Sequence, residues 1–349
     1  MKDLLIYGAY GYSGRLILAA ALARGLRPIA AGRDADKLAK LAREFGVPQR
    51  AFSLDDPDAA QAGLEGIGVV LHCAGPFSRT AQQMANACIA RRAHYLDITG
   101  EWAVIEALAQ RSDEFARAGI MAMPAVGFDV VPSDCLAAHM RRRLPTATHL
   151  ELHIRGLEKL SRGTANSFIE ALGKPGHARV NGELRKQPAG RERSRLTLDG
   201  RHFNMVCLPW GDIASAWRTT GIGNIKVHMN QPRAVPFLLA LAARAPSFWQ
   251  RRAVQAALKR LTRLLPPGPD AQCRAARTTD FIAVARDAEG RSVATRLSTP
   301  EAYALTAQTA TEIARRVMDG EVLPGFATPG QCFGPDFILG FEGAKRTDL

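Results

Sequence analysis

The sequence has few cysteines, and their spacing matches neither a metal-binding motif nor a disulfide framework. Its 349 residues include six cysteines, and no two of them form a C-x-x-C pair. They are Cys73, Cys88, Cys135, Cys207, Cys273 and Cys332. This spacing excludes a zinc ribbon and argues against a small disulfide scaffold, so we expect reduced thiols and a cytoplasmic protein.

Long apolar runs are also missing. A membrane-spanning helix requires about 18–20 apolar residues in a row, whereas the longest candidate, residues 235–243, is closed by Arg244. The opening MKDLLIYGAYGYSG has no basic segment followed by a long apolar run, so we expect no signal peptide. With 47% hydrophobic and 23% charged residues, the composition is that of a globular protein, and the length is enough for two domains.

Acidic residues are scarce only in the middle of the chain. Residues 1–130 carry 14 basic and 14 acidic residues, residues 131–267 carry 23 and 8, and residues 268–349 carry 9 and 11. The overall net charge of +13 therefore belongs to the middle segment. A basic surface suits acidic ligands, anionic lipid or nucleic acid, and charge alone does not choose among them. We expect no nucleic-acid partner.

Short apolar runs alternate with helical patterns over the first third of the chain. We predict strands at 3–7, 27–31, 67–73 and 94–98, and helices at 15–23, 35–45 and 80–91. Residues 67–73, IGVVLHC, form a continuous apolar run, which is typical of a central strand buried on both faces. Strands alternating with helices of this length predict a parallel, doubly wound sheet.

The middle third is patterned differently. Residues 148–154, THLELHI, alternate strictly, and shorter alternating runs follow at 195–198, 202–208 and 225–229. The polar, basic stretch 174–195 is predicted to be a loop. Residues 277–285 and 292–297 predict a hairpin. Thr299-Pro300-Glu301 predicts the start of the last long helix, with Pro at its first position.

A glycine-rich turn lies between the first predicted strand and the first predicted helix. Its spacing is G-x-x-G-x-x-G, a variant of the dinucleotide-binding turn. The residues expected to contact a cofactor here are Gly8, Ala9, Tyr10, Gly11, Tyr12, Ser13 and Gly14. Gly8 allows a tight turn, Gly11 lets a pyrophosphate approach the backbone, and Gly14 allows close helix–strand packing. The helix N-terminus adds N–H donors and partial positive charge.

The residue after the next strand distinguishes the two nicotinamide dinucleotides. An NAD-selective site would normally place Asp or Glu here to accept from the ribose 2′-OH. This chain instead has Arg33, with Lys37 one helical turn further. A guanidinium at this point can pair with a 2′-phosphate. We therefore predict NADP(H) as the cofactor, although Asp34 and Asp36 lie close by.

Several motifs occur in a characteristic order. They are the turn at 8–14, Ala31-Gly32-Arg33, Ala74-Gly75-Pro76-Phe77, HYLDITGE at 94–101 and GFDVVPSD at 127–134, with YALTA at 303–307 and TPGQCFG at 328–334 near the end. Together they resemble the saccharopine dehydrogenase-like family, and within it the branch of trans-acting enoyl reductases and saccharopine dehydrogenase-like oxidoreductases. The resemblance is dense over residues 1–135, patchy over 136–270 and moderate from 271.

The resemblance implies an α/β fold: a Rossmann doubly wound parallel sheet with an inserted, mixed α/β second domain. We expect an NADP-binding domain at 1–131, completed by the C-terminal segment 300–349, and a substrate or oligomerisation domain, open to homodimer formation, at 132–299. The resemblance also implies a cleft between the domains.

It further implies a nicotinamide-side site just past a central strand, at Cys73, Ala74, Gly75, Pro76 and Phe77. The residues agree, because ligands of open parallel sheets bind beyond the carboxyl ends of the strands. A plain Gly-Pro turn is the alternative interpretation.

Three residues at or after strand ends are candidates for catalysis: Tyr95, Asp97 and Ser133. Tyr95 has the chemistry of a general acid, and Asp97 that of an acceptor for cofactor hydroxyl groups. Ser133 stands in the first turn of a predicted helix, where it could contact substrate. Each residue also has a structural interpretation: Tyr95 packs in the core, Asp97 caps the next helix, and Ser133 with Asp134 stabilises a helix start.

His149, Glu151 and His153 alternate along one predicted strand and therefore share a face. That spacing would suit a metal ion, but no fourth ligand or metal-binding motif accompanies it. We interpret these residues as a solvated sheet face and predict no metal.

No familiar catalytic set accompanies the turn: we find neither a Ser-His-Asp set nor a Tyr-x-x-x-Lys pair. A nicotinamide supplies the hydride, so the protein has to orient substrate and exclude water. We expect an NADPH-dependent oxidoreductase that reduces a C=C or C=O bond of a small acyl or lipid-like molecule. Two alternatives stay open: a saccharopine-type dehydrogenase that reduces an imine made from an amino acid and an oxo acid, and a cofactor-binding protein without turnover.

Residues 247–265, SFWQRRAVQAALKRLTRLL, predict one amphipathic helix. Ser247 and Gln250 have the spacing of a capping box, and an apolar arc of about 140° lies opposite five basic residues and no acidic one. Phe248 and Trp249 at its start are typical of helices in a membrane interface. Two alternatives follow: a peripheral location on an anionic membrane surface, or packing of the apolar arc against a domain core.

Overall fold

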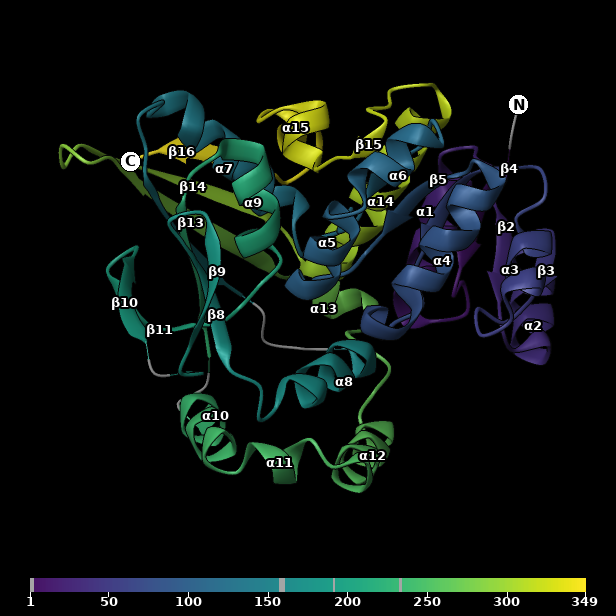
Figure 1. The fold of residues 1–349 in the computed structure, drawn as a ribbon, viewed down its shortest axis with the longest axis horizontal. Coiled ribbons are helices and arrows are strands. Elements are labelled where there is room, and N and C mark those ends of the chain that lie inside the picture. The colour runs from purple at the N-terminus through teal and green to yellow at the C-terminus, as the bar shows by residue number, and fades with distance from the viewer. Residues whose placement is uncertain (1–2, 157–160, 191, 232–233) are drawn as a thin grey trace. The chain divides into compact units, whose positions relative to one another are not determined.

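The computed structural model describes residues 3–156, 161–190, 192–231 and 234–349. It divides into two compact units, which Figure 1 shows together. The first unit comprises Met1–Val131 and Ala302–Gly334, and the second comprises Pro132–Glu301 and Pro335–Leu349. The chain thus leaves the first unit, builds the second, returns to the first, and ends in the second.

The first unit is built on a seven-stranded sheet in the order β15-β6-β5-β4-β1-β2-β3. Its strands are β1 (Asp3–Tyr7), β2 (Ile29–Gly32), β3 (Gln49–Ala51), β4 (Ile67–His72), β5 (His94–Asp97), β6 (Met121–Met123) and β15 (Gly325–Phe326). Every neighbouring pair is parallel. The predicted doubly wound Rossmann sheet is confirmed, with the strand order reversing between β1 and β4.

Helices cover this sheet because each has an apolar side that packs against it. They are α1 (Tyr12–Ala23), α2 (Ala35–Phe45), α3 (Pro57–Gly63), α4 (Phe77–Arg91), α5 (Trp102–Ala109), α6 (Ser112–Arg117), α14 (Ala302–Met318) and α15 (Pro329–Phe333). In α2, the buried Leu38 and Leu41 lie one turn apart, Asp34 caps the N-terminus, and Gly46 ends the helix with φ of 65°. The returning helix α14 packs on α1 and β4.

The second unit holds a mixed nine-stranded sheet in the order β10-β11-β12-β7-β13-β14-β16, with β8 paired to β12 and β9. Its strands are β7 (His149–Arg155), β8 (Gly176–Val180), β9 (Glu183–Gln187), β10 (Arg193–Leu198), β11 (Arg201–Cys207), β12 (Asn224–Asn230), β13 (Thr278–Arg286), β14 (Ser292–Pro300) and β16 (Lys345–Asp348). Within the part of this unit that the structure describes, only β12 and β7 pair in parallel. The alternation predicted for β7 is confirmed, since Leu150, Leu152 and Ile154 are buried.

The second unit also carries α7 (Val131–Arg143), α8 (Arg162–Ala171), α9 (Asp212–Thr220), α10 (Ala234–Arg244), α11 (Pro246–Trp249), α12 (Arg252–Leu261) and α13 (Ala271–Ala275), with short 3-10 turns η1 (Thr262–Leu264) and η2 (Phe337–Gly340). No helix within the described residues is both long and apolar enough to cross a membrane.

The stretch 174–195 was predicted as a loop, and this prediction is wrong over most of its length. Residues 176–187 form the β8–β9 hairpin. The polar sequence does not look like a strand, because an arginine is not expected at a buried position. Arg179 is nevertheless only 4% exposed: it donates to the carbonyl oxygens of Ile213 and Gly182 and stacks over Trp217. Such contacts are not visible in a local pattern.

Two predictions near the C-terminus also need correction. Residues 300–349 do not all complete the first unit, because β16 pairs with β14 and draws 335–349 into the second. The last long helix does not begin at Thr299-Pro300-Glu301. Instead β14 continues through Pro300, which pairs with Thr278 at the end of the ladder, and α14 begins at Ala302.

Candidate cofactor site and active site

The glycine-rich turn follows β1 directly and is held by backbone hydrogen bonds from both neighbouring strands. Gly8 has φ of 83° and, like Ala9, donates its N–H to the carbonyl of Ala31 near the end of β2. On the other side, the N–H of Cys73 donates to the carbonyl of Tyr7 at 2.7 Å. The turn therefore lies at the carboxyl ends of β1, β2 and β4, where the strand order reverses.

The three glycines differ in what a side chain would meet. A Cβ on Gly14 would lie 2.3 Å from the carbonyl oxygen of Gly8, and a Cβ on Gly8 would lie 2.8 Å from the backbone nitrogen of Ala74. These two positions are closed by the protein itself. A Cβ on Gly11 would meet only the Gly8 oxygen, at 3.2 Å. Gly11 therefore presents an open backbone face, and no side chain caps α1 there.

Arg33 stands at the carboxyl end of β2 with its side chain exposed. The neighbouring acid Asp34 is committed to α2: its carboxylate accepts from the Lys37 N–H at 3.1 Å and pairs with Lys37 Nζ at 2.7 Å. These hydrogen bonds from Lys37 lower the pKa of Asp34. Tyr10 packs over Gly32 beside them, because a Cβ on Gly32 would fall 2.6 Å from the Tyr10 ring. Arg33 faces solvent, as do Asp36 and Lys37 after it.

The segment after β4 forms the start of α4 and is tied to the segment after β5. Glu101 accepts hydrogen bonds from the N–H groups of Phe77 and Ser78 at 3.0 and 3.1 Å. Thr80 donates to the carbonyl of Ala74 at 2.8 Å, and the Gly75–Pro76 bond is cis. The predicted nicotinamide-side residues 73–77 therefore lie at the sheet edge beside the glycine-rich turn.

Tyr95 and Asp97 are brought together, but both are fully buried. The Tyr95 hydroxyl donates to Asp97 Oδ2 at 2.5 Å, while Asp97 Oδ1 accepts from the N–H groups of Thr99 and Ala125 at 2.9 and 2.8 Å. Burial raises the pKa of Asp97 to about 6 and that of Tyr95 well above its ordinary value. This geometry suits positioning residues that join the loops after β5 and β6.

Asp129 was not singled out from the sequence, although it lies inside the GFDVVPSD motif. It is half-buried in the loop after β6, and its carboxylate lies against Gly100, where a Cβ would meet Oδ2 at 2.9 Å. Burial raises the pKa of Asp129 to about 7, and no hydrogen bond to its carboxylate occurs among the described residues. The GFDVVPSD motif could have pointed to Asp129, but the sequence around it does not show that its carboxylate is buried against Gly100.

The loop that carries Asp129 is fixed by the returning helix α14. The N–H of Phe128 donates to Thr306 Oγ1 at 3.0 Å, and Thr309 Oγ1 donates to the carbonyl of Val126 at 2.9 Å. Gly127 has no room for a side chain, since a Cβ would lie 2.9 Å from Thr306. The C-terminal segment thus fixes this loop by side-chain contacts.

Ser133 belongs to the second unit, in the first turn of α7. It is 1% exposed, and the adjacent Asp134 accepts a hydrogen bond from Thr219 Oγ1 at 2.6 Å. The helix predicted to start at this motif is confirmed, and it ends at Arg143. The role of Ser133 toward a substrate stays a prediction.

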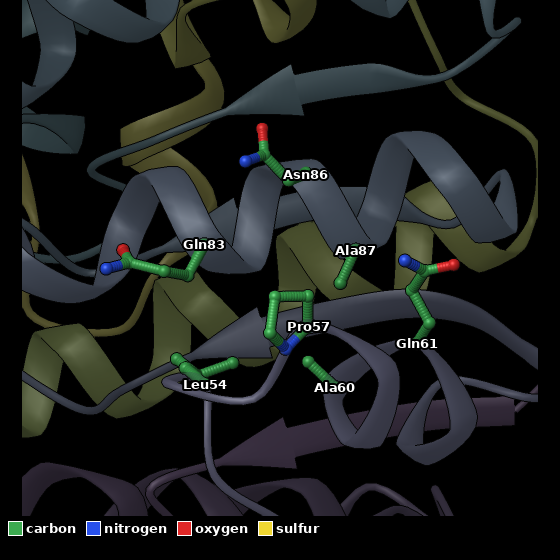
Figure 2. A pocket seen from close by; sticks show the side chains of 7 residues that line it. All are labelled: Leu54, Pro57, Ala60, Gln61, Gln83, Asn86 and Ala87. Atoms are coloured by element: carbon green, nitrogen blue, oxygen red, sulfur yellow. The ribbon is translucent and has the colours of Figure 1, made fainter.

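A small pocket lies between α3 and α4 (Figure 2). It is lined by Leu54, Pro57, Ala60, Gln61, Gln83, Asn86 and Ala87. Its volume is about 60 Å³. It contains no residue of the glycine-rich turn and is too small for a dinucleotide, so it is distinct from the candidate site.

A parallel sheet with a glycine-rich turn at its point of strand reversal defines a dinucleotide-binding domain of Rossmann type. Residues 4–123 match the family described as saccharopine dehydrogenase NADP binding domain. This match covers the first domain alone, and for that domain it confirms the resemblance and the NADP cofactor predicted from the sequence.

Curated relatives resemble part of the chain. A trans-acting enoyl reductase of Mycobacterium leprae is 32% identical over 150 residues, which cover 41% of this chain and 36% of that protein. A probable mitochondrial saccharopine dehydrogenase-like oxidoreductase of Arabidopsis thaliana is 29% identical over 149 residues, covering 38% and 33%. The chain thus spans about a third of the length of these relatives.

Solved structures show the fold over the whole chain. Saccharopine dehydrogenase (L-Glu forming) from Saccharomyces cerevisiae has a TM-score of 0.68 at 12% identity, covering all of both chains. Homospermidine synthase from Legionella pneumophila, in complex with NAD, has a TM-score of 0.62 at 10% identity, covering all of this chain and 92% of that one. The predicted fold class is confirmed.

Proposed function

We propose that the protein is an NADPH-dependent reductase that transfers hydride to a C=C or C=O bond of an acyl or lipid-like substrate. The observation that carries the proposal is the charge arrangement after β2, where Arg33 faces solvent while Asp34 is held by Lys37. The name of the mycobacterial relative, a trans-acting enoyl reductase, supports reduction of a C=C bond.

The residues present fit the phosphates of NADPH, which would supply the hydride when bound. Gly11 and the N-terminus of α1 would bind the pyrophosphate, because the backbone there is open on one side. Arg33 would pair with the 2′-phosphate, with Lys37 one turn further. Residues 73–77, at the carboxyl end of β4, would contact the nicotinamide-side ribose.

Reduction of a C=C or C=O bond also requires a proton at the atom that does not receive the hydride. We assign the proton donor to Asp129, because its pKa of about 7 leaves it partly protonated at neutral pH. It lies at the same edge of the sheet as the turn, beyond β6. Tyr95 and Asp97 then act by joining the loops beneath it rather than by donating a proton themselves.

The reaction is tested by following NADPH oxidation with panels of enoyl thioesters, long-chain aldehydes and ketones, and amino acid–oxo acid pairs. We expect turnover with at least one acyl substrate, and none in the Gly11→Val variant, in which a side chain occupies the approach of the pyrophosphate. Turnover confined to amino acid–oxo acid pairs would replace the proposal with a saccharopine-type dehydrogenase. Tight NADPH binding without turnover on any panel would indicate a cofactor-binding protein.

The source of an acyl substrate is suggested by an exposed apolar surface on the second unit. Large apolar side chains project to solvent from α10 to the end of η1; they are Phe237, Leu238, Leu241, Phe248, Leu261, Leu264 and Leu265, between 42% and 84% exposed. We call this set the apolar ridge. Arg244, Arg251, Arg252, Arg260 and Arg263 are exposed beside it, and residues 234–269 contain no acidic residue.

This region differs from the single helix predicted for 247–265. The helix is interrupted after Trp249, where α11 ends, and α12 begins at Arg252. Gln250 does not complete a capping box, because its amide donates to the carbonyl of Leu172. One side of α12 packs on α8, where Gln255 donates to the carbonyl of Ile169 at 2.9 Å. The apolar ridge is left on the outside, so core packing accounts for only part of the predicted apolar arc.

We propose that the apolar ridge binds an anionic lipid surface. Five exposed arginines, at about 1 kcal/mol each near such a surface, combine with apolar side chains that would be buried among the acyl chains. We expect the protein to sediment with vesicles containing phosphatidylglycerol at low salt. Neutral phosphatidylcholine vesicles and high salt should reduce binding at least tenfold, because both remove the electrostatic attraction.

A pair of matched leucines provides the control for this experiment. Leu264→Glu, at 84% exposure within the ridge, should release the protein from anionic vesicles, whereas Leu323→Glu, at 46% exposure in the first unit, should not. Protein that remains in the supernatant under every condition would contradict lipid binding without affecting the reductase proposal.

A further inference from the structure

Two histidines that are distant in the sequence meet at the centre of the second sheet. His153 on β7 and His228 on β12 are direct partners in the parallel ladder, so their side chains share one face. Glu151 lies two residues before His153 and therefore on that same face. His153 is 7% exposed and His228 is 2% exposed. The solvated face predicted for Glu151 and His153 is therefore wrong for the histidine, whose side chain is buried.

The three side chains converge. One ligand atom from each of Glu151, His153 and His228 lies within 4.8 Å of the others. His153 Nε2 is 3.7 Å from Glu151 Oε2, and the two imidazole rings are stacked with centroids 4.8 Å apart and planes inclined by 13°. Ligands about 2.0–2.1 Å from a tetrahedral zinc ion lie roughly 3.3–3.4 Å from one another. The observed separations, 3.7 Å for His153 Nε2 and Glu151 Oε2 and up to 4.8 Å within the group, are longer, so the side chains would have to close on the ion.

The imidazoles are also poorly satisfied by the protein. The Nδ1 atoms of His153 and His228 are buried and have no hydrogen-bond partner among the described residues. Their Nε2 atoms face carboxylates at 3.7 Å (Glu151) and 3.9 Å (Glu192), which is beyond hydrogen-bond distance. Neither ring is thus committed to a hydrogen bond among the described residues, so one nitrogen of each imidazole is available to bind a ligand.

The surrounding charged side chains leave one carboxylate oxygen of Glu151 available to bind a metal ion. Arg286 Nη1 lies 3.6 Å from Glu151 Oε1, which is the oxygen other than the one nearest His153. Lys226 engages Glu192 at 2.7 Å on the other side of His228. Cys207 on β11 is the ladder partner of His228 and adds a further ligand type at this face.

We propose that Glu151, His153 and His228 bind a divalent transition-metal ion that links β7 to β12. Two imidazoles and one carboxylate form a common three-ligand set for zinc, and such a set leaves a fourth position for water or another ligand. Glu192 and Cys207 border His228, where that position would be completed. The ion would join strands 75 residues apart in the chain. This inference is independent of the reductase activity.

The experiment uses the full chain without a histidine tag, stripped of metal by a chelator and returned to Zn²⁺. Competition against a chromogenic chelator should give one equivalent bound at micromolar affinity or tighter, and thermal unfolding should shift upward with added Zn²⁺. His153→Ala and His228→Ala should each weaken binding at least 100-fold, since losing even a residue that supports a ligand costs 10- to 100-fold. His149→Ala, exposed at the start of β7, is the matched control and should bind as the parent does.

Two results of the binding experiment would overturn the proposal. One is a parent chain that binds no Zn²⁺; the other is a His153→Ala/His228→Ala double variant that binds it with unchanged affinity. Because ligand variants can misfold, X-ray absorption on the zinc-loaded parent provides a measurement that needs no variant. Imidazole scattering from two histidines is expected, and its absence also rejects the site.

Discussion

The Arg33→Asp variant should bind NADPH about 100-fold more weakly than the parent while its affinity for NADH changes by no more than about threefold. A factor of 100 corresponds to about 3 kcal/mol. The effect is large because a charge-assisted partner of the 2′-phosphate is replaced by a like charge. The Lys37 ammonium, one turn further, is not free to replace the lost cation, since it is already paired with Asp34. Fluorescence titration with both dinucleotides measures the ratio.

Arg27→Asp is the matched control for this selectivity change. Arg27 is exposed just before β2, at the amino end of the strand, whereas Arg33 follows its carboxyl end. The control reverses the same charge next to the same strand, and it should change the affinities for NADPH and NADH little. Equal losses of NADPH and NADH in Arg33→Asp would remove Arg33 from the 2′-phosphate site.

The Asp129→Asn variant should lower kcat about 100-fold or more with little change in KM, because general acid catalysis contributes 10²–10⁴-fold. In the parent, kcat should fall as the pH rises through about 7, since only the protonated carboxyl can donate. That limb should be missing from the pH profile of the variant. Asp113→Asn, an exposed aspartate in α6, should leave kcat and its pH profile unchanged.

The pH dependence of thermal unfolding distinguishes a proton-donating role of Asp129 from a structural one. Folding raises the pKa of Asp129 from 3.8 to about 7, so the contribution of Asp129 to stability is fully present below about pH 4 and is lost as the pH rises through 7. Asp129→Asn removes that loss, and the variant should unfold at a higher temperature than the parent at pH 8. A variant that retains activity at pH 6 would show that Asp129 donates no proton.

Local patterns predicted the first unit well because its elements are short and strongly periodic. The buried strand at 67–72 and helix α2 at 35–45 lie where their apolar spacing placed them. The glycine spacing likewise predicted the turn, since Gly8 adopts a positive φ and Gly14 touches the carbonyl of Gly8. Each of these features depends on residues within about a dozen positions of one another.

The β8–β9 hairpin and the apolar ridge were decided by partners distant in the sequence. Arg179 lies in a strand because the carbonyl oxygen of Ile213 and the ring of Trp217 satisfy its guanidinium. Leu264 is exposed because α8 takes the other side of the segment through Gln255 and Thr262. In both cases the local pattern was compatible with two environments, and only the neighbouring element selected one.

The sequence by itself determined the Rossmann sheet, the phosphate-binding turn and the cation after β2, because these follow from periodicity and from residues adjacent in the chain. The tertiary structure alone decided the state of three side chains. Asp129 acquires a raised pKa through burial beside Gly100, Asp97 is enclosed by loops from two strands, and His228 is set against His153 by the β7–β12 register. Burial and cross-strand pairing depend on which distant segments meet, and a local pattern does not contain that information.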